Sequence, residues 1–288
     1  MKKLFAVALA AAMALSLVAC GGSASSAPAA SSAAASSKAS GTSAAAEGGL
    51  VEKIKAKGKL VVGTEAQYAP FEFKDSKAQF AGCDIWLAQQ IADELGVTLE
   101  ITDMAFDGII PAVKSGQVDI GIAAFTVTPE RAEEIDFSNV YQRDEQMLIV
   151  QKGQENTYTT KESLAGKKVG AQKGTVQSLL IKAALPESEL FELAKYPALA
   201  LEVANGNIAG LVVDGAVGEG LIATNDNIVA ANFKFDPAEA NFGKAAVMAK
   251  GSEDLAEVVN KVIDKVVADG SFETAYNDAV ALSKTLGI

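Results

Sequence analysis

Short apolar runs and amphipathic stretches take turns along most of the chain. Runs of strand length occur at residues 60–63, 97–101 and 118–124. Between them, apolar positions recur every three or four residues over 84–95 and 107–114, which predicts two helices. The order β-α-β-α-β predicts a parallel sheet with helices on both faces.

Acidic residues and glycines bound the two predicted helices. The carboxylates of Asp84 and Asp107 can accept hydrogen bonds from the first backbone N–H groups, so both residues are predicted N-caps. Gly96 and Gly116 follow the last apolar positions and are predicted to end the helices.

A second unit of the same type follows. Strands are predicted at residues 167–171, 190–193 and 208–213, and helices at 176–184 and 197–204. The chain therefore contains two similar α/β units in succession.

Two further features relate the units: an equivalent helix stop in each, and two segments that cross between them. The tetrapeptides SGQV at 115–118 and NGNI at 205–208 occupy equivalent places, each a helix stop before a buried strand. Apolar runs at 146–150 and 244–249 are predicted to cross between the units, one entering the second unit and the other leaving it. Two crossings make a hinge with a cleft beside it, where such folds bind ligands.

The predicted fold class is α/β, with two Rossmann-like lobes joined by a two-strand hinge. The first lobe is predicted to comprise residues 50–146 and 243–288, and the second lobe residues 147–242. Two long helical patterns, at 254–268 and 272–286, close the chain.

The N-terminal residues 1–19 have the features of a signal peptide. Lys2 and Lys3 precede an apolar run at 4–18, which is too short for a comfortable membrane span. Small residues before Cys20 resemble a lipobox, which implies cleavage before this residue and diacylation of its thiol. The alternative is an ordinary signal peptide followed by a chance cysteine.

Residues 20–49 are predicted to be a lipidated cysteine followed by a tether. Ala, Ser, Gly and Thr dominate this stretch, a composition that cannot build a core. Because no later run is long and apolar enough to cross a bilayer, we expect the lipid to anchor the domain to the extracytoplasmic face of the membrane.

Composition excludes several classes of function. The formal net charge of −11 argues against nucleic acid as a partner. With Cys20 lipidated, Cys83 is alone and is predicted to be a small packing residue. The chain has no histidine, which removes histidine-based catalysis and most zinc sites, so we predict neither a metal nor a cofactor.

Four segments together carry a specific resemblance. They read GTEAQYAPFEF at 63–73, FDGIIPA at 106–112, TVTPER at 126–131 and GKKVGAQKGT at 166–175. In this order, they resemble the polar amino-acid-binding proteins of ABC importers, the extracellular solute-binding proteins of family 3. The resemblance spans residues 51–271 and implies a periplasmic-binding-protein type II fold, an amino acid as ligand and an importer permease as partner.

The resemblance implies roles for residues that would hold the ligand backbone. Arg131 matches the clamp for the α-carboxylate, Thr126 a hydroxyl and amide contact, and Asp214 the acid for the α-ammonium. Thr175 and Val176 match a helix start that offers free amides. Without the resemblance, Arg131 reads as a surface residue and Asp214 as an N-cap.

The resemblance also implies which residues surround the ligand side chain. Tyr68, Phe106 and Phe125 match positions that wrap it, and Glu65 matches an acidic position in the same pocket. Gln172 can hydrogen-bond a basic or an amide ligand. The alternatives are core packing for the aromatic residues and a solvated carboxylate for Glu65.

The sequence departs from the family pattern in ways that leave the ligand open. Ala123 and Ala124 stand where relatives often carry serines, and Lys244 stands in a Phe-Gly-Lys sequence where Tyr-Gly-Ile is usual. We expect a monomeric protein that binds a polar or basic amino acid, with arginine or lysine slightly favoured over glutamine or cystine. The alternative from another class is a dehydratase of this fold, with Glu65 and Lys173 as its candidate acid and base.

Overall fold

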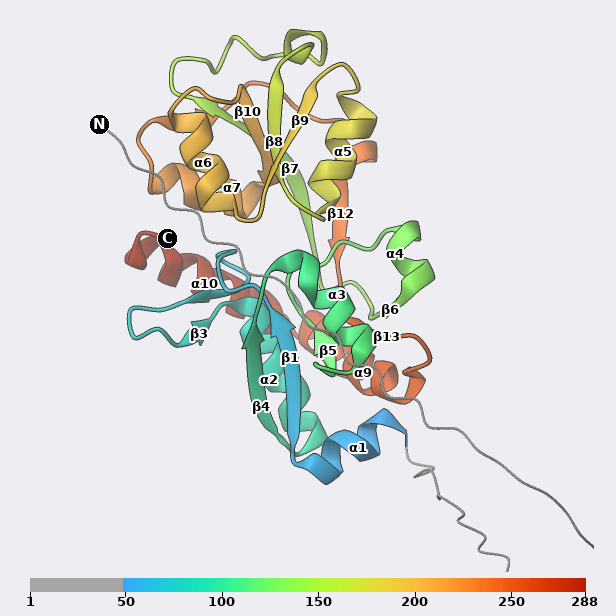
Figure 1. Cartoon of the computed structure of the whole chain (residues 1–288). Coiled ribbons are helices and arrows are strands. Elements are labelled where there is room, and N and C mark those ends of the chain that lie inside the picture. Colours follow the sequence, from blue (N-terminus) through green and yellow to red (C-terminus); the bar gives the residue numbers. More distant parts are fainter. Residues whose placement is uncertain (1–48) are drawn as a thin grey trace, which may run out of the picture. The chain divides into compact units, whose positions relative to one another are not determined.

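The computed structural model describes residues 49–288 and shows two β-sheets, one in each lobe (Figure 1). The predicted signal peptide (1–19), Cys20 and nearly all of the tether lie outside these residues. Within them, no helix has both the length and the apolar character needed to cross a bilayer.

The first sheet has five strands with two parallel pairings at its centre. The strands in spatial order are β4 (Thr98–Asp103), β1 (Lys59–Thr64), β5 (Ile120–Gly121), β13 (Val247–Ala249) and β6 (Ile135–Phe137). Strand β1 is parallel to both β4 and β5, whereas β13 is antiparallel to β5 and β6.

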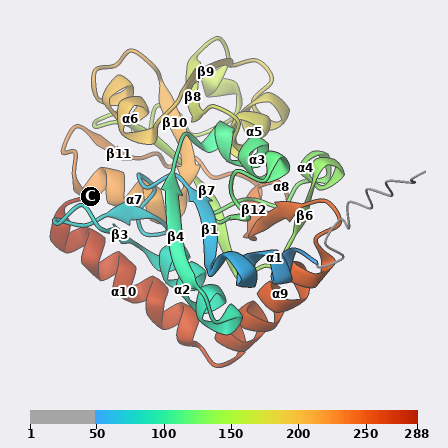
Figure 2. The ribbon, with the colours of Figure 1, turned by 60° about the horizontal axis from the view of Figure 1, so that its bottom comes forward.

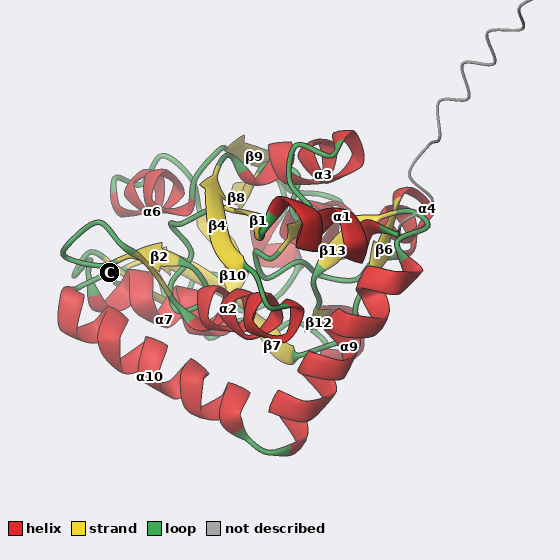
Figure 3. Ribbon diagram, turned by 90° about the horizontal axis from the view of Figure 1, so that it is seen from below, coloured by secondary structure: helices red, strands yellow, loops and turns green. Residues whose placement is uncertain are grey.

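Helices cover both faces of this sheet. They are α1 (Leu50–Lys57), α2 (Cys83–Leu95), α3 (Phe106–Ser115), α4 (Pro129–Glu134), α9 (Glu253–Ala268) and α10 (Ser271–Leu286); a small hairpin pairs β2 (Phe73–Lys74) with β3 (Phe80–Ala81). Figures 2 and 3 both show α2, α9 and α10 side by side. Successive residues of β1 face opposite ways, since Leu60 and Val62 share a core cluster with α2 and α9, and Val61 shares another with α3.

The second sheet repeats this plan. Its strands are β11 (Ile228–Ala230), β7 (Gln142–Gln151), β10 (Gly210–Asp214), β8 (Lys168–Gln172) and β9 (Glu189–Leu193), with β12 (Asn241–Lys244) also paired to β7. Strand β8 is parallel to β9 and β10. The helices are α5 (Val176–Ala184), α6 (Tyr196–Ala204), α7 (Gly215–Ala223), α8 (Pro237–Ala240) and a 3-10 turn at Glu162–Leu164.

The predicted α/β fold class is confirmed, and the helix stops occupy the same place in both lobes. Gly116 follows α3 with φ +72°, and Gly206 follows α6 with φ +71°. Glycine adopts this left-handed conformation without steric cost, so each helix can reverse directly into the next buried strand.

The crossings between the lobes lie a few residues away from the predicted positions. Residues 142–145 of β7 pair antiparallel with 241–244 of β12, and this pair forms the hinge. The predicted segment 146–150 is instead sheet in the second lobe, and residues 247–249 of the predicted segment 244–249 belong to the first sheet. The apolar runs marked strands inside the two cores, whereas the crossing itself is polar.

Three predictions about local structure were wrong. The N-cap positions of α2 and α3 are Gly82 and Ala105, so neither Asp84 nor Asp107 caps its helix. The strand predicted at 118–124 is limited to Ile120–Gly121, because the chain turns away at Ala124, which has φ +45°.

Asp84 has a different structural role. Its carboxylate is fully buried and accepts hydrogen bonds from the Ala124 N–H at 2.7 Å and the Tyr141 hydroxyl at 2.9 Å. Burial raises the pKa of Asp84 to about 6. The neighbouring Cys83 is a free thiol in the same core, as a packing residue would be. Asp84 thereby ties α2 to the turn that leads into the TVTPER motif.

Replacing Asp84 by alanine should lower the free energy of unfolding by about 2–5 kcal/mol, because two buried donors lose their acceptor. Urea unfolding followed by circular dichroism measures this change. Asp93→Ala, on the exposed side of the same helix, is the matched control and should stay within about 0.5 kcal/mol of the unchanged protein. Equal stability of the two variants would contradict the structural role of Asp84.

Candidate functional site

A narrow pocket of about 20 Å³ lies between the lobes, which in this closed arrangement is room for about one water molecule. The first lobe contributes residues from the ends of its strands and from α3 and α4: Glu65, Tyr68, Glu72, Phe106, Ala123, Ala124, Thr126 and Arg131. The second lobe and the hinge contribute Gln172, Thr175, Val176, Gln177, Tyr196, Asp214 and Lys244.

The parallel strands explain why these residues meet. Glu65 directly follows β1, Gln172 is the last residue of β8, and Asp214 is the last residue of β10. Ligand sites of open α/β sheets form outside the carboxyl ends of the strands. Nine of the ten predicted site residues line the pocket; the exception is Phe125.

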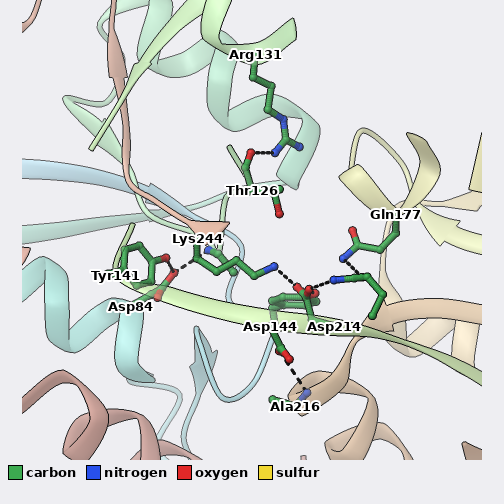
Figure 4. A network of polar contacts seen from close by, with 12 residues as sticks. Asp84, Thr126, Arg131, Tyr141, Asp144, Gln177, Asp214, Ala216 and Lys244 are labelled. Atoms are coloured by element: carbon green, nitrogen blue, oxygen red, sulfur yellow. Dashed lines mark hydrogen bonds and ion pairs between the residues drawn. The ribbon is translucent and has the colours of Figure 1, made fainter. Parts of the chain in front are cut away.

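Arg131 provides the cationic side of the pocket. The Thr128 hydroxyl accepts a hydrogen bond from the Arg131 N–H at 3.2 Å and so caps α4. The guanidinium donates to the Thr126 carbonyl at 2.8 Å and, across the cleft, to the Gly174 carbonyl at 3.0 Å (Figure 4 shows the first bond). It forms no ion pair with any acid among residues 49–288.

The surroundings of Arg131 favour an incoming carboxylate. Its guanidinium carbon lies 5.5 Å from the ring centroids of both Phe106 and Phe125. Removal from water lowers its pKa to about 10, so Arg131 is still protonated at neutral pH. A half-buried guanidinium with carbonyl contacts alone can bind a carboxylate in a bidentate manner.

Phe125 contacts the pocket only through its neighbours. It is fully buried and stacks on Phe106 with ring centroids 4.7 Å apart. It therefore supports Phe106 from behind and also faces Arg131, and its predicted contact with the ligand side chain stays a prediction. A strand-end aromatic cannot be assigned to core or wall from sequence, because both positions are apolar.

Asp214 lies on the opposite, anionic side. It occupies the N-cap position of α7, as the alternative reading had it, but its side chain makes no capping hydrogen bond to that helix. The carboxylate is buried and accepts three hydrogen bonds of 2.5 Å each, from the Tyr68 hydroxyl, the Gln146 amide and the Lys244 ammonium (Figure 4 shows the last two). Donors from both lobes and from the hinge thus converge on one side chain.

Glu65 is the second acid of the pocket. Only 4% of the residue is exposed, so the alternative reading as a solvated carboxylate was wrong. The Gln172 amide donates to Oε2 of Glu65 at 2.6 Å across the cleft, whereas Oε1 has no hydrogen-bond partner. Burial raises the pKa of Glu65 to about 7, although the bond from Gln172 opposes this shift. An unpartnered oxygen in this position can accept a bond from a ligand donor.

The second lobe presents a helix start to the pocket. Thr175 directly precedes α5 and its hydroxyl donates to the Gln172 carbonyl at 2.6 Å, so it does not cap the helix. The first N–H groups of α5, beginning at Val176, have no intrahelical acceptor and favour an anion. Arg131 bonds the carbonyl of Gly174, which lies in the turn just before these groups.

Six pocket residues were not predicted as site residues, and two of them, Ala123 and Ala124, had been singled out only as departures from the family pattern. The ring of Tyr196 is tilted against that of Tyr68 across the cleft, with the centroids 5.1 Å apart. Gln177 donates to the Gln146 side chain at 2.9 Å, and Glu72 and Lys244 are almost completely buried. Glu72 belongs to the motif at 63–73, and Lys244 was noticed only as a departure from the family pattern. Nothing in the local sequence separates Tyr196 and Gln177 from ordinary residues at helix starts.

Lys173, the candidate base of the alternative dehydratase, is outside the pocket wall. Its ammonium pairs at 2.8 Å with Asp107 across the cleft entrance, and both side chains are exposed. The pocket therefore holds a cationic side and an anionic side but brings no lysine together with Glu65 as an acid–base pair.

Comparisons with known proteins agree with this geometry. The family model described as bacterial extracellular solute-binding proteins, family 3, matches residues 60–279. The putative ABC transporter arginine-binding protein 2 of Escherichia coli K12 is 33% identical over 215 residues, covering 74% of this chain and 87% of that protein. The ABC transporter glutamine-binding protein GlnH of Bacillus subtilis is 31% identical over 281 residues, covering 96% of each.

A solved structure shares the two-lobed fold. The amino acid ABC transporter substrate-binding protein AbpA of Streptococcus pneumoniae, bound to L-arginine, superposes with a TM-score of 0.77. It is 37% identical, and the match covers 81% of this chain and 98% of that chain. With the family model matched from β1 into α10, the chain belongs to the bacterial extracellular solute-binding proteins of family 3.

Proposed function

We propose that this protein captures a polar or basic L-amino acid between its lobes and delivers it to the permease of an ABC importer. The observation that carries the proposal is one cavity with an unpaired guanidinium on one side and buried carboxylates on the other. A zwitterion is the ligand whose charges match this arrangement. The relatives named for arginine and glutamine bind ligands of this class.

The contacts suggest how the ligand lies. Its α-carboxylate binds Arg131 and the free amides at the start of α5, with Thr126 and Thr175 beside it. Its α-ammonium is directed toward Asp214. The two lobes that close on it are joined by the hinge pair 142–145 and 241–244.

The side chain of the ligand extends toward Glu65. The aromatic rings of Tyr68, Phe106 and Tyr196 provide flat apolar walls, and Gln172 offers an amide. A guanidinium or ammonium on Glu65 would form a charge-assisted bond, which makes arginine or lysine the favoured ligand. Glutamine or cystine is the alternative, since a neutral amide can also bond to Glu65.

Location and partners follow from the family and from the N-terminal sequence. We propose that Cys20 carries a diacyl anchor and that residues 20–49 hold the monomeric binding domain at the outer face of the membrane. The net charge of −11 keeps the protein away from anionic lipid and nucleic acid.

Binding without catalysis fits the pocket better than dehydration does. An enzyme needs an acid or base placed at a leaving group, and Glu65 is already held by Gln172. Its supposed partner Lys173 pairs with Asp107 outside the pocket wall. Incubation with a cyclic amino-acid precursor should therefore return the compound unchanged.

Replacing Arg131 by alanine should weaken binding of the cognate amino acid by about 2–5 kcal/mol, because the ligand carboxylate loses its counter-charge. Isothermal titration against a panel of amino acids measures the effect. Arg143, the one other arginine of the sequence, is exposed on β7, and Arg143→Ala is the matched control. Unchanged affinity of Arg131→Ala would exclude the clamp.

The pH dependence of binding separates a basic ligand from a neutral one. The pKa of Glu65 is about 7 in the free protein, and a cationic ligand favours the ionised form, so binding releases a proton. The affinity for arginine should be full above pH 7 and fall by up to about tenfold per unit as pH decreases below 7. Glutamine binding should change much less.

Glu65→Gln should remove this pH dependence and weaken arginine binding, whereas a glutamine ligand can pair with the new amide. Glu133→Gln, an exposed change on α4, is the control and should leave both ligands unaffected. If the wild-type protein binds glutamine or cystine and ignores arginine and lysine, the preference for a basic ligand is wrong.

Cys20→Ala should abolish lipid attachment and leave ligand binding intact, because Cys20 precedes the binding domain by about 30 residues of tether. Partitioning of the expressed protein into the detergent phase tests the anchor, and titration of the soluble variant tests the binding domain. Detergent partitioning that persists in Cys20→Ala would exclude the lipidation site.

A further inference from the structure

Lys244 places a second cation inside the pocket. Its Nζ lies 2.5 Å from Oδ2 of Asp214, and 1% of each side chain is exposed. Lys244 is the last residue of β12 in the hinge, and its backbone also bridges to Thr126 in the first lobe. This ion pair is therefore shielded from solvent at the point where the two lobes join.

The ion pair uses the side of Asp214 that faces the pocket. An ionised carboxylate has about four acceptor positions, and Asp214 already accepts from Tyr68, Gln146 and Lys244. Its negative charge is balanced by a lysine of the chain itself. A ligand ammonium that approaches Asp214 meets a like charge in the same desolvated space.

A second carboxylate is available to Lys244. Glu72 lines the same pocket, is 1% exposed, and its Oε2 has no hydrogen-bond partner. Burial raises the pKa of Glu72 well above its usual range, while the charge of Lys244 opposes the shift. Lys244 also lies 6.0 Å from the centroid of the Phe71 ring, adjacent to Glu72 in the chain.

We propose that Lys244 is a built-in competitor for the α-ammonium of the ligand at Asp214, and that the ammonium reaches Asp214 only as Nζ moves toward Glu72. The inference rests on the proposed amino-acid function and refines it. Lys244 lowers the affinity for α-amino acids. It also brings that affinity closer to the affinity for desamino carboxylic acids with the same side chain. A pocket in which Asp214 had no lysine partner would discriminate more strongly against such desamino ligands.

Lys244→Met tests this role because it removes the cation and keeps much of the apolar stem. The free variant should melt at a lower temperature than wild type, since Asp214 is left buried without its counter-ion. Its affinity for the amino acid should nevertheless rise by about tenfold or more, because the ligand ammonium no longer competes. Titration with L-arginine and L-glutamine measures this change.

Desamino analogues separate the ammonium from the rest of the ligand. The probes are 5-guanidinopentanoate for arginine and glutaramate for glutamine. Wild type should bind the matching analogue within about tenfold of the amino acid, whereas Lys244→Met should prefer the amino acid by about a hundredfold or more. This comparison uses wild type as well, so it decides the question even if the variant does not fold.

Lys57→Met is the matched control. Lys57 also forms a 2.5 Å pair with a buried acid, Asp119, but outside the pocket. Its removal should lower the melting temperature without changing affinity for any of the four probes.

The outcomes separate the two proposals. If Lys244→Met binds the amino acid equally well or more weakly than wild type, Lys244 is not a competitor. A wild-type preference of about a hundredfold for the amino acid over its analogue excludes the competitor role too. Either result leaves the proposed amino-acid function in place. If neither wild type nor Lys244→Met binds arginine, glutamine or the analogues, the proposed amino-acid function is wrong together with the inference.

Discussion

The carboxylate of Asp214 is a buried charge that both lobes and the hinge neutralise together. Tyr68 approaches it from the first lobe, Gln146 from the second and Lys244 from the hinge. A buried carboxylate is unfavourable unless it is paired and hydrogen-bonded, so these three donors are positioned by necessity as well as by function. The relative placement of the lobes is therefore coupled to the charge state of this one site.

The same desolvation acts on three other acids, of which only Glu65 lines the pocket. Burial raises the pKa of Asp84 to about 6, that of Asp144 to about 6 and that of Glu65 to about 7. These groups are held near their titration ranges at physiological pH, and Arg131 supplies a cation that forms no ion pair with an acid among residues 49–288. A pocket with such incompletely balanced charges gains more from a charged ligand than an electrically saturated pocket would.

Local sequence patterns were sufficient for the architecture because periodicity depends on neighbours in the chain. Strand and helix periods predicted both β-α-β units and the helix stops at Gly116 and Gly206. They placed the hinge wrongly, because apolar runs mark sheet interiors and the crossing at 142–145 is polar. They also assigned Asp84 to a cap, since a buried acceptor bonded to a distant loop has no local signature.

The family resemblance, read from sequence, identified nine residues that line one pocket, several of them at strand ends that converge in this fold. Only the tertiary structure decided that Phe125 supports Phe106 from behind and that Tyr196 lines the pocket beside Tyr68. It alone showed that Lys244 pairs with Asp214, 30 residues away. By itself, the sequence determined which chemical groups the chain carries and how they are spaced. Which charges neutralise one another was decided in three dimensions, because Coulomb energies depend on distance and burial, and sequence order records neither.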